Sequence, residues 1–473
     1  MENASSTQEP LNSEPSFAIR GPPSKNFLRS VSNKEPQFTE PPCIPPRLST
    51  TSLSLKPFFS PPASPPRHHL SSTTPSRLHE LHTNYKCISS ILKKDGQILS
   101  IASSNGLVYT GSQGNVIRIW KLPEFAECGQ LKTKACMAVA LEVSNDRIYA
   151  AYADCKIRVW RRSWDGNIKH VRIATIPNTG SYVRSYIARG KDKMMKHMGP
   201  ISSLAINVSY DILYSASLDR TVKVWRLSDL KCIETIQGHP EPINDIVVAD
   251  DGVLYTASDD AAVRVWRRNF CNGDHPHSLT VTLPAKSSPI KTLALTVDGG
   301  VLYGGCTDGY VQYWLKGWLS GQLQYGGALP GHTHAVMCLA SVVNYVVSGS
   351  ADGTSRIWIR EQDGRHACIG VLQGHRGPIR CVAAFLERVS EDTEEGCTVC
   401  TASLDGVLKA SWNSGLRLNP FTRALIAMRL IIFQQPPDPM TQQTESHKDA
   451  NDNQDRNQIR FDRRILALKQ ESQ

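Results

Sequence analysis

A fourteen-residue segment, Ile212 to Trp225 (ILYSASLDRTVKVW), recurs along most of the chain and constrains its fold more than any other feature. Aligned on the last residue, the copies end at Trp120, Trp160, Trp225, Trp266, Trp314, Trp358 and Ser411, with Trp412 one position later. The intervals are 40, 65, 41, 48, 44 and 53 residues. A repeated unit of about 40 to 45 residues with four short strands has the spacing of a propeller blade. The sequence therefore predicts an all-β fold, a seven-bladed β-propeller.

Each copy is expected to contain two strands joined by a tight turn. Residues 253–258 form an apolar, β-prone run, and residues 263–266 alternate with period two. Three copies place a Gly in the turn, at Gly309, Gly353 and Gly406, where a positive φ angle is favoured. The residue before this position is Gly114 in the first copy. In the other six copies it is Asp: Asp154, Asp219, Asp260, Asp308, Asp352 and Asp405.

The segment Lys86 to Ile91 resembles Lys231 to Ile236, which is expected to be the outermost strand of a blade. The first segment precedes the first blade, whereas the seventh blade ends at Trp412 without an outermost strand. We therefore expect residues 86–91 to complete the seventh blade and to close a ring that spans residues 85–412. A closed ring leaves no large open sheet edge.

The two ends of the chain lack the repeat. Residues 1–84 are rich in Pro, Ser and Thr and are expected to be a disordered arm, because they carry too little apolar surface to offset the entropy of ordering. Ser64 and Thr74 fit proline-directed phosphorylation sites, although such short matches also arise by chance in a tail of this composition. In the tail at 413–473, residues 421–433 are expected to form a short amphipathic helix followed by disorder.

On these residues the chain resembles the WD40 repeat family. The Gly-His pairs at His239, His332 and His375 precede the corresponding Trp positions by 26 to 36 residues. The resemblance implies a hydrogen-bonded tetrad of His, Ser or Thr, Asp and Trp inside a blade. The residues at these positions are His239, Ser258, Asp260 and Trp266 in the fourth blade; His332, Asp352 and Trp358 in the sixth; His197, Asp219 and Trp225 in the third; and His375 and Asp405 in the seventh.

Two further patterns refine this resemblance. Lys121, Arg161, Arg226 and Arg267 follow the Trp where many family members have Asp, so the Trp-Asp-x-Arg element that docks on ubiquitin-ligase adaptors is absent. A ligase substrate receptor is therefore disfavoured. The segments at 159–166, 169–177 and 181–186 are similar to the plant Jingubang-like WD40 subgroup, whose members are regarded as non-enzymatic regulators of development.

The sequence favours neither catalysis nor a bound cofactor. His and Asp recur in most blades, whereas a hydrolase requires one nucleophile, one base and one oxyanion hole in a single cleft. Cys397 and Cys400 have the spacing of half a zinc site, but positions i and i+3 of a strand point to opposite faces and no second pair lies at suitable spacing. We expect no enzyme activity, no metal and no cofactor.

The amino-acid composition indicates in which compartment the protein lies and which classes of partner it can bind. Thirteen cysteines, mostly in predicted strands, indicate reduced thiols and a cytoplasmic or nuclear protein. The apolar run at 424–433 is interrupted by Arg429 and is too short to span a bilayer, so no membrane partner is expected. A cation lies two residues before the Trp in five copies: Arg118, Arg158, Lys223, Arg264 and Arg356. These cations suit either nucleic-acid binding or packing between blades with their charges at the rim.

Recognition is expected where the copies differ. If the Gly-His loops and Asp turns lie at one end of the propeller, the neighbouring side chains surround the mouth of the central channel. These residues, here called the rim, are Met198, Leu218, Glu241, Asp259, Thr333, Arg376 and Leu404. The loop at 177–200 is expected at the same end and carries Tyr182, Arg184, Tyr186, Arg189, Lys191 and Lys193. These side chains suit an acidic or phosphorylated peptide. A solvated loop without a partner is the alternative.

The predicted function is a non-catalytic scaffold, monomeric within a complex, that binds other proteins in plant regulatory or developmental signalling. The alternative is an RNA-associated subunit that uses the basic loop at 184–196 and the net charge of +10. Such RNA binding would weaken steeply with salt.

Overall fold

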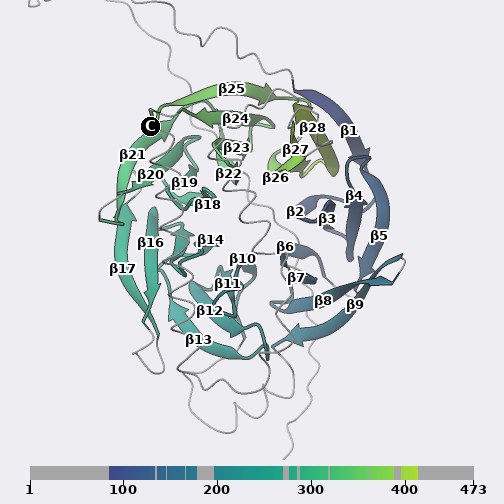
Figure 1. Cartoon of the computed structure of the whole chain (residues 1–473), viewed down its shortest axis with the longest axis horizontal. Coiled ribbons are helices and arrows are strands. Elements are labelled where there is room, and N and C mark those ends of the chain that lie inside the picture. Colours follow the sequence, from purple (N-terminus) through teal and green to yellow (C-terminus); the bar gives the residue numbers. More distant parts are fainter. Residues whose placement is uncertain are drawn as a thin grey trace, which may run out of the picture. The chain divides into compact units, whose positions relative to one another are not determined.

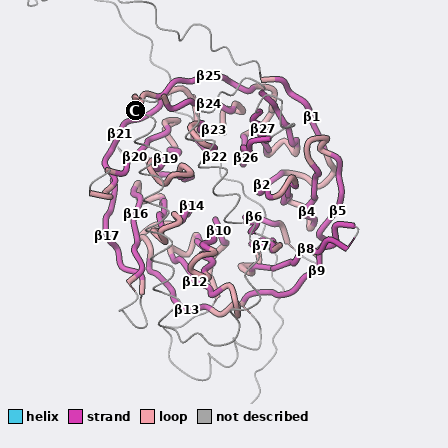
Figure 2. The backbone as a smooth tube through the Cα atoms, in the orientation of Figure 1, coloured by secondary structure: helices cyan, strands magenta, loops and turns pink. Residues whose placement is uncertain are grey.

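Seven four-stranded antiparallel sheets surround a central channel in the computed structural model of the chain (Figure 1). The structure describes residues 85–133, 136–144, 146–165, 167–177, 196–269, 276–284, 288–317, 320–361, 363–387 and 396–413. Figure 2 shows only strands and loops in this part of the chain. Within it, no helix has the length and hydropathy that crossing a bilayer requires. The seven-bladed propeller predicted from the repeat is confirmed.

The strands follow one another from the channel outward in each blade. The first three blades comprise β2 (Ile98–Ser104), β3 (Leu107–Ser112), β4 (Val116–Lys121) and β5 (Ala126–Lys132); β6 (Ala138–Ser144), β7 (Arg147–Tyr152), β8 (Ile157–Asp165) and β9 (Asn167–Ile176); and β10 (Ile201–Asn207), β11 (Ile212–Ser217), β12 (Thr221–Arg226) and β13 (Cys232–Gln237).

The next three blades repeat this order. They comprise β14 (Ile243–Val248), β15 (Leu254–Ser258), β16 (Ala262–Arg268) and β17 (His277–Pro284); β18 (Ile290–Leu295), β19 (Val301–Cys306), β20 (Val311–Lys316) and β21 (Leu323–Leu329); and β22 (Val336–Val342), β23 (Tyr345–Ser350), β24 (Ser355–Arg360) and β25 (His366–Leu372).

The seventh blade joins the two ends of the ring. It contains β26 (Ile379–Glu387), β27 (Gly396–Ser403) and β28 (Val407–Asn413), and its outermost strand is β1 (Lys86–Leu92). β1 pairs antiparallel with β28, with Lys86 opposite Trp412 and Leu92 opposite Val407. The ring therefore closes through hydrogen bonds between the first and last described strands, as the sequence predicts.

The apolar core is divided among the junctions between blades. Seven clusters of buried apolar side chains each combine residues of two neighbouring blades. Trp225, for example, packs in the cluster between the second and third blades, and Trp266 in the one between the third and fourth. The cluster between the sixth and seventh blades contains no Trp, because the seventh copy has Ser411 at that position. Each blade thus buries its apolar face against its neighbours.

The predictions for residues 1–84, including Ser64 and Thr74, and for the helix at 421–433 lie outside the described residues.

Candidate interaction surface and its framework

The His, Asp and Trp side chains expected to form tetrads meet in the third and sixth blades. In the third, His197 Nδ1 lies 3.1 Å from Asp219 Oδ2, and His197 Nε2 lies 2.8 Å from Ser215 Oγ. The Trp225 indole N–H donates to Ser215 Oγ at 2.9 Å. The sixth blade repeats the arrangement with His332, Ser348, Asp352 and Trp358, at 2.9, 2.8 and 2.9 Å respectively.

The prediction of Ser258 as the tetrad hydroxyl of the fourth blade is wrong. Thr256, not Ser258, accepts the Trp266 indole N–H at 3.1 Å and contacts His239 Nε2 at 2.7 Å, while His239 Nδ1 lies 2.7 Å from Asp260. Ser258 instead donates to the Glu241 carbonyl and accepts the Asp260 backbone N–H. It ends the strand and orders the turn, as Ser217, Ser350 and Ser403 do in other blades.

The chemistry of the four side chains determines which atom donates and which accepts in each hydrogen bond of a tetrad. The indole N–H can only donate, so the Ser or Thr oxygen accepts it and directs its own O–H to His Nε2. His Nδ1–H then donates to the Asp carboxylate. Burial keeps the pKa values of His197, His239, His332 and His375 below the usual value, which favours this neutral ring. The pKa of Asp352 falls to about 2, because hydrogen bonds from Thr354, His332 and Thr333 outweigh the effect of burial.

The other blades use different polar groups. In the seventh, His375 bonds to Asp405 and Thr401, but Ser411 replaces the Trp. In the second, the Arg158 guanidinium pairs with Asp154 at 2.7 Å and lies over the Tyr152 ring. In the first blade the Trp120 indole N–H donates to Thr110, and in the fifth the hydroxyls of Ser288 and Thr307 bond to each other.

Cys397 and Cys400 lie in two different clusters of the apolar core. Cys397 packs between the sixth and seventh blades, whereas Cys400 packs between the seventh and first. The two thiols therefore point to opposite faces of β27. Within the described part of the chain, no group of three His, Cys, Asp or Glu side chains is placed to hold a metal ion.

The cations before the Trp positions are engaged within the propeller. Arg118 pairs with Asp95 and Glu127, and Arg264 donates to the Gly238 carbonyl at 2.7 Å. Lys223 is buried, which lowers its pKa, and it donates to Thr235. Arg356 lies against Gly331. These contacts favour the packing interpretation over a continuous nucleic-acid stripe.

Three rim residues are held by the same backbone hydrogen bond, and their side chains extend into solvent. The backbone N–H groups of Met198, Thr333 and Arg376, each directly after the His that bonds to the turn Asp, donate to the Asp of their own blade at 2.8, 3.1 and 2.9 Å. Their side chains are exposed, as is that of Glu241. The same backbone geometry therefore presents a thioether, a hydroxyl and a guanidinium.

The residues that precede the turn Asp are held in the same way. Leu218, Asp259 and Leu404 donate their backbone N–H groups to the carbonyls of Pro200, Pro242 and Pro378 respectively. Met198 and Leu218 flank Asp219 and are 70% and 43% exposed, so they form an apolar pair on the third blade. Leu404 is half-buried.

Asp259 differs from the other rim residues because its carboxylate is already paired. Lys291 of the fifth blade lies 2.5 Å from Asp259 Oδ1, and Asn244 donates to the same oxygen at 2.8 Å. Partial burial raises the pKa of Asp259, but the bonds from Lys291 and Asn244 outweigh it and lower the pKa overall. Asp259 therefore links two blades rather than offering an unpaired charge.

Tyr182, Arg184, Tyr186, Arg189, Lys191 and Lys193 of the predicted binding loop lie outside the described residues.

Three tyrosine–histidine pairs that the sequence interpretation missed join neighbouring blades. The hydroxyls of Tyr109, Tyr214 and Tyr303 lie 3.4, 3.0 and 2.8 Å from Nε2 of His170, His277 and His366 respectively. Each Tyr is on the second strand of one blade and each His on the outermost strand of the next. The separations are 61, 63 and 63 residues, so a search for Tyr and His at constant spacing could have found them.

Comparison with known proteins agrees with this geometry. The family model for the WD domain, G-beta repeat, matches residues 191–226, 230–267 and 323–358. The matched segments end in the third, fourth and sixth blades, where the structure brings all four tetrad members together.

Curated relatives share part of the propeller. An F-box/WD-40 repeat-containing protein of Arabidopsis thaliana is 26% identical over 137 residues, 29% of this chain and 23% of that protein. Telomerase protein component 1 of Rattus norvegicus is 26% identical over 219 residues, 44% of this chain and 8% of its own length. A nuclear distribution protein of Arthroderma otae is 24% identical over 297 residues, 61% of this chain and 55% of its own length.

The chain thus spans less than two thirds of the length of each of these relatives. WD40 propellers bind other proteins and typically act as non-catalytic interaction scaffolds. The matched repeats, the tetrads and the closed seven-bladed ring together show that this chain contains WD40 repeats and folds as a seven-bladed propeller of the WD40 type.

Proposed function

We propose that this propeller is a non-catalytic scaffold that binds a partner protein on its rim. The observation that carries the proposal is the exposed apolar pair of Met198 and Leu218, held on the third blade by backbone bonds to Asp219 and Pro200. The buried core of a protein–protein interface is apolar, and Met is enriched in such interfaces relative to the rest of the surface. Because the framework residues are bonded to one another, binding requires little ordering of the backbone.

The remaining rim supplies polar specificity. Arg376 on the seventh blade and Thr333 on the sixth are exposed, and the backbone position of each is fixed by its Asp. An Arg side chain favours a carboxylate or phosphate on the partner. The proposed partner segment therefore carries an apolar residue for the third blade and an acidic or phosphorylated residue for the seventh.

The biological setting is proposed on separate grounds. The resemblance of residues 159–186 to the Jingubang-like subgroup supports a role in plant regulatory signalling. The eleven cysteines among the described residues form no disulfide bonds with one another, which supports a cytoplasmic or nuclear location.

Affinity purification with quantitative mass spectrometry tests the rim. The double variant Met198→Glu and Leu218→Glu is expected to lose a defined set of bound proteins, because two carboxylates replace the apolar anchor. Leu279→Glu is the matched control, since Leu279 is 45% exposed but lies on the outermost strand β17. Identical bound proteins for the wild type and the double variant would contradict the proposal.

A further inference from the structure

The bond between a His and the turn Asp occurs on four of the described blades, and the third differs from the other three in the residues beside it. Lys196 precedes its His, whereas the fourth, sixth and seventh blades have Gly there: Gly238, Gly331 and Gly374. Arg220 follows its Asp, whereas those blades have an uncharged residue: Ala261, Gly353 and Gly406. The third blade therefore carries two cations where the equivalent positions are small and neutral.

Arg220 occupies a backbone position that favours Gly. In six blades the residue after the turn Asp has a positive φ angle: Cys155, Arg220, Ala261, Gly309, Gly353 and Gly406. The φ angle of Arg220 is 73°, close to the 78° and 80° of Gly353 and Gly406. A positive φ costs free energy for a residue with a Cβ atom, and such costs are concentrated at functional sites. The turn alone does not account for an Arg at this position.

Neither cation is engaged within the propeller. In the part of the chain that the structure describes, the Lys196 ammonium and the Arg220 guanidinium have no ion pair and no side-chain hydrogen bond. The nearby carboxylate of Asp219 is instead bonded by His197 at 3.1 Å and by the Thr221 hydroxyl at 2.6 Å. Arg220 is exposed and Lys196 is half-buried. Both charges are therefore available to a partner.

The cations share one small surface with the apolar pair of Met198 and Leu218. The Met198 backbone N–H and His197 Nδ1 both contact Asp219 Oδ2, at 2.8 and 3.1 Å, which holds residues 196–198 beside residues 218–220. His197 is buried, whereas Met198 and Leu218 on either side of the bond are exposed. Four surface residues, two apolar and two basic, thus surround a single buried hydrogen bond.

The two cations lie toward different neighbouring blades. Burial raises the pKa of the Cys155 thiol in the turn of the second blade, and the charge of Lys196 opposes this shift, so Lys196 lies toward the second blade. The Arg220 carbonyl accepts the backbone N–H of Gly238 at 3.1 Å, in the loop that leads into the fourth blade. A partner segment that crosses the apolar pair from one neighbour to the other therefore meets a cation before and after it.

We propose that this surface binds a partner segment in which acidic residues flank an apolar side chain. The apolar side chain packs on Met198 and Leu218, and the carboxylates pair with Lys196 and Arg220. A basic segment would place like charges together, which costs free energy and excludes it as a partner. A nucleic-acid backbone would neutralise the cations but leave the apolar pair without an apolar partner. The inference rests on the proposed function and adds a charge requirement at the third blade.

Selection of a randomised peptide library on the purified full chain tests this requirement. The wild type is expected to enrich peptides in which an apolar residue lies between Asp or Glu residues. The double variant Lys196→Gln and Arg220→Gln should lose this acidic preference. It should also bind a peptide selected on the wild type about fivefold to tenfold more weakly in fluorescence polarisation, because two exposed ion pairs are lost.

The matched control removes two cations from the other end of the same blade. Arg226 and Lys231 pair with Asp229 at 3.3 and 3.1 Å, so the double variant Arg226→Gln and Lys231→Gln should select and bind peptides like the wild type. Arg220→Gly separates binding from folding. It removes the Cβ atom at a positive φ angle, so its thermal stability should equal or exceed that of the wild type while peptide binding weakens.

Three results would overturn the inference: selected peptides without an excess of Asp and Glu, equal binding by the wild type and both cation variants, or single-stranded RNA that binds the wild type and is lost in the cation double variant. Failure of the inference is distinguishable from failure of the rim function. If Met198→Glu with Leu218→Glu loses bound proteins while the cation variants bind peptide normally, only the charge requirement fails. If neither pair of substitutions has an effect, the rim function fails as well.

Discussion

Thr256 and Ser258 stand two positions apart on β15, and only one of them contacts the indole of Trp266. In the strand ladder Trp266 lies opposite Leu254 and Thr256 lies opposite Arg264. The Trp side chain leans along the strand, which brings its N–H to the Thr hydroxyl. The same separation of ten residues joins Thr110 to Trp120, Ser215 to Trp225 and Ser348 to Trp358. The register of the sheet therefore selects the tetrad hydroxyl.

Replacing Thr256 with Val removes the acceptor of Trp266 and the donor to His239. We expect the free energy of unfolding to fall by about 2 to 4 kcal/mol, since two buried polar groups lose their partner. Ser258→Ala should cost about 1 kcal/mol. Denaturant unfolding measures both, and the indole N–H resonance of Trp266 should move only in Thr256→Val. A larger shift in Ser258→Ala would assign the tetrad to Ser258.

At the scale of the elements, the Tyr–His pairs attach the outermost strand of one blade to the preceding blade. Tyr303 and His366 meet edge to face, with ring centroids 5.6 Å apart. Burial, followed by the charge of Arg360, lowers the pKa of His366 to about 4 from 6.5. Burial and Arg162 act likewise on His170, whose pKa is also about 4. Both rings are therefore neutral in the folded protein at pH 7.

These pairs make stability depend on pH in the acidic range. Since the folded pKa is lower than the unfolded value, the unfolded chain takes up the proton first, and stability falls as the pH decreases from about 6.5 to 4. His366→Gln should reduce this loss, as measured by urea unfolding at pH 7 and pH 5. His334→Gln, in an exposed loop, is the control. An unchanged difference between the two pH values in His366→Gln would contradict the prediction.

At the scale of the whole molecule, the seven innermost strands surround a channel, and the carboxyl group of Glu142 on β6 lies at its wall. A cavity of about 300 Å³ there is lined by Glu142 together with Ala102, Ala294, Ala340 and Ala383. Burial, reinforced by the charge of Asp245 on β14, raises the pKa of Glu142 to about 8. Asp245 itself accepts the backbone N–H of Leu293 at 2.8 Å and so joins the fourth blade to the fifth.

Glu142 should destabilise the ring as the pH rises. Its folded pKa lies above the unfolded value of 4.5, so the stability present below pH 4.5 is lost as the pH increases through about 8. Glu142→Gln should remove this dependence and exceed the wild type in thermal stability at pH 9. Glu241→Gln, on the exposed rim, is the control. Equal midpoints for wild type and Glu142→Gln at pH 9 would show that Glu142 does not titrate in this way.

The sequence by itself determined the number of blades, the strands that build them and the strand that closes the ring. These features follow from a local pattern: alternating β-prone residues, a turn Asp and a recurring Trp, repeated at the spacing of a blade. It also indicated which His and Asp residues meet, because both lie at constant positions relative to the Trp. Local chemistry repeated seven times leaves few alternative folds.

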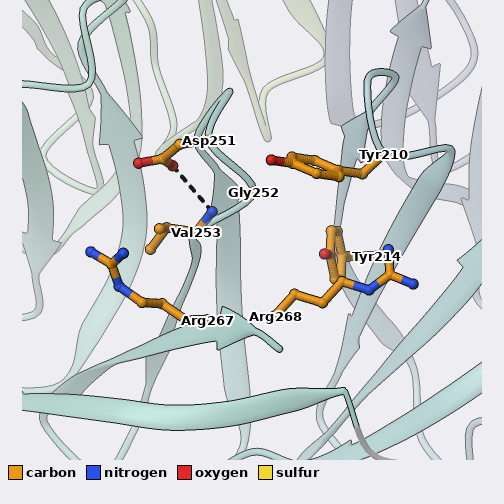
Figure 3. Close-up of a pocket in the computed structure, with 7 residues that line it drawn as sticks. All are labelled: Tyr210, Tyr214, Asp251, Gly252, Val253, Arg267 and Arg268. Carbon is orange, nitrogen blue, oxygen red and sulfur yellow. Dashed lines mark hydrogen bonds between the residues drawn. The ribbon is translucent and has the colours of Figure 1, made fainter. Parts of the chain in front are cut away.

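Only the tertiary structure decided the contacts that depend on register and on neighbouring blades. The choice of Thr256 over Ser258, the pairing of Asp259 with Lys291 and the Tyr–His pairs join side chains whose positions are set by different strands. The same is true of a cavity of about 140 Å³ between the third and fourth blades (Figure 3), which is lined by Tyr210 and Tyr214 of the third blade and by Asp251, Gly252, Val253, Arg267 and Arg268 of the fourth. A period-two pattern assigns a side chain to a face, but its partner depends on how two faces pack together.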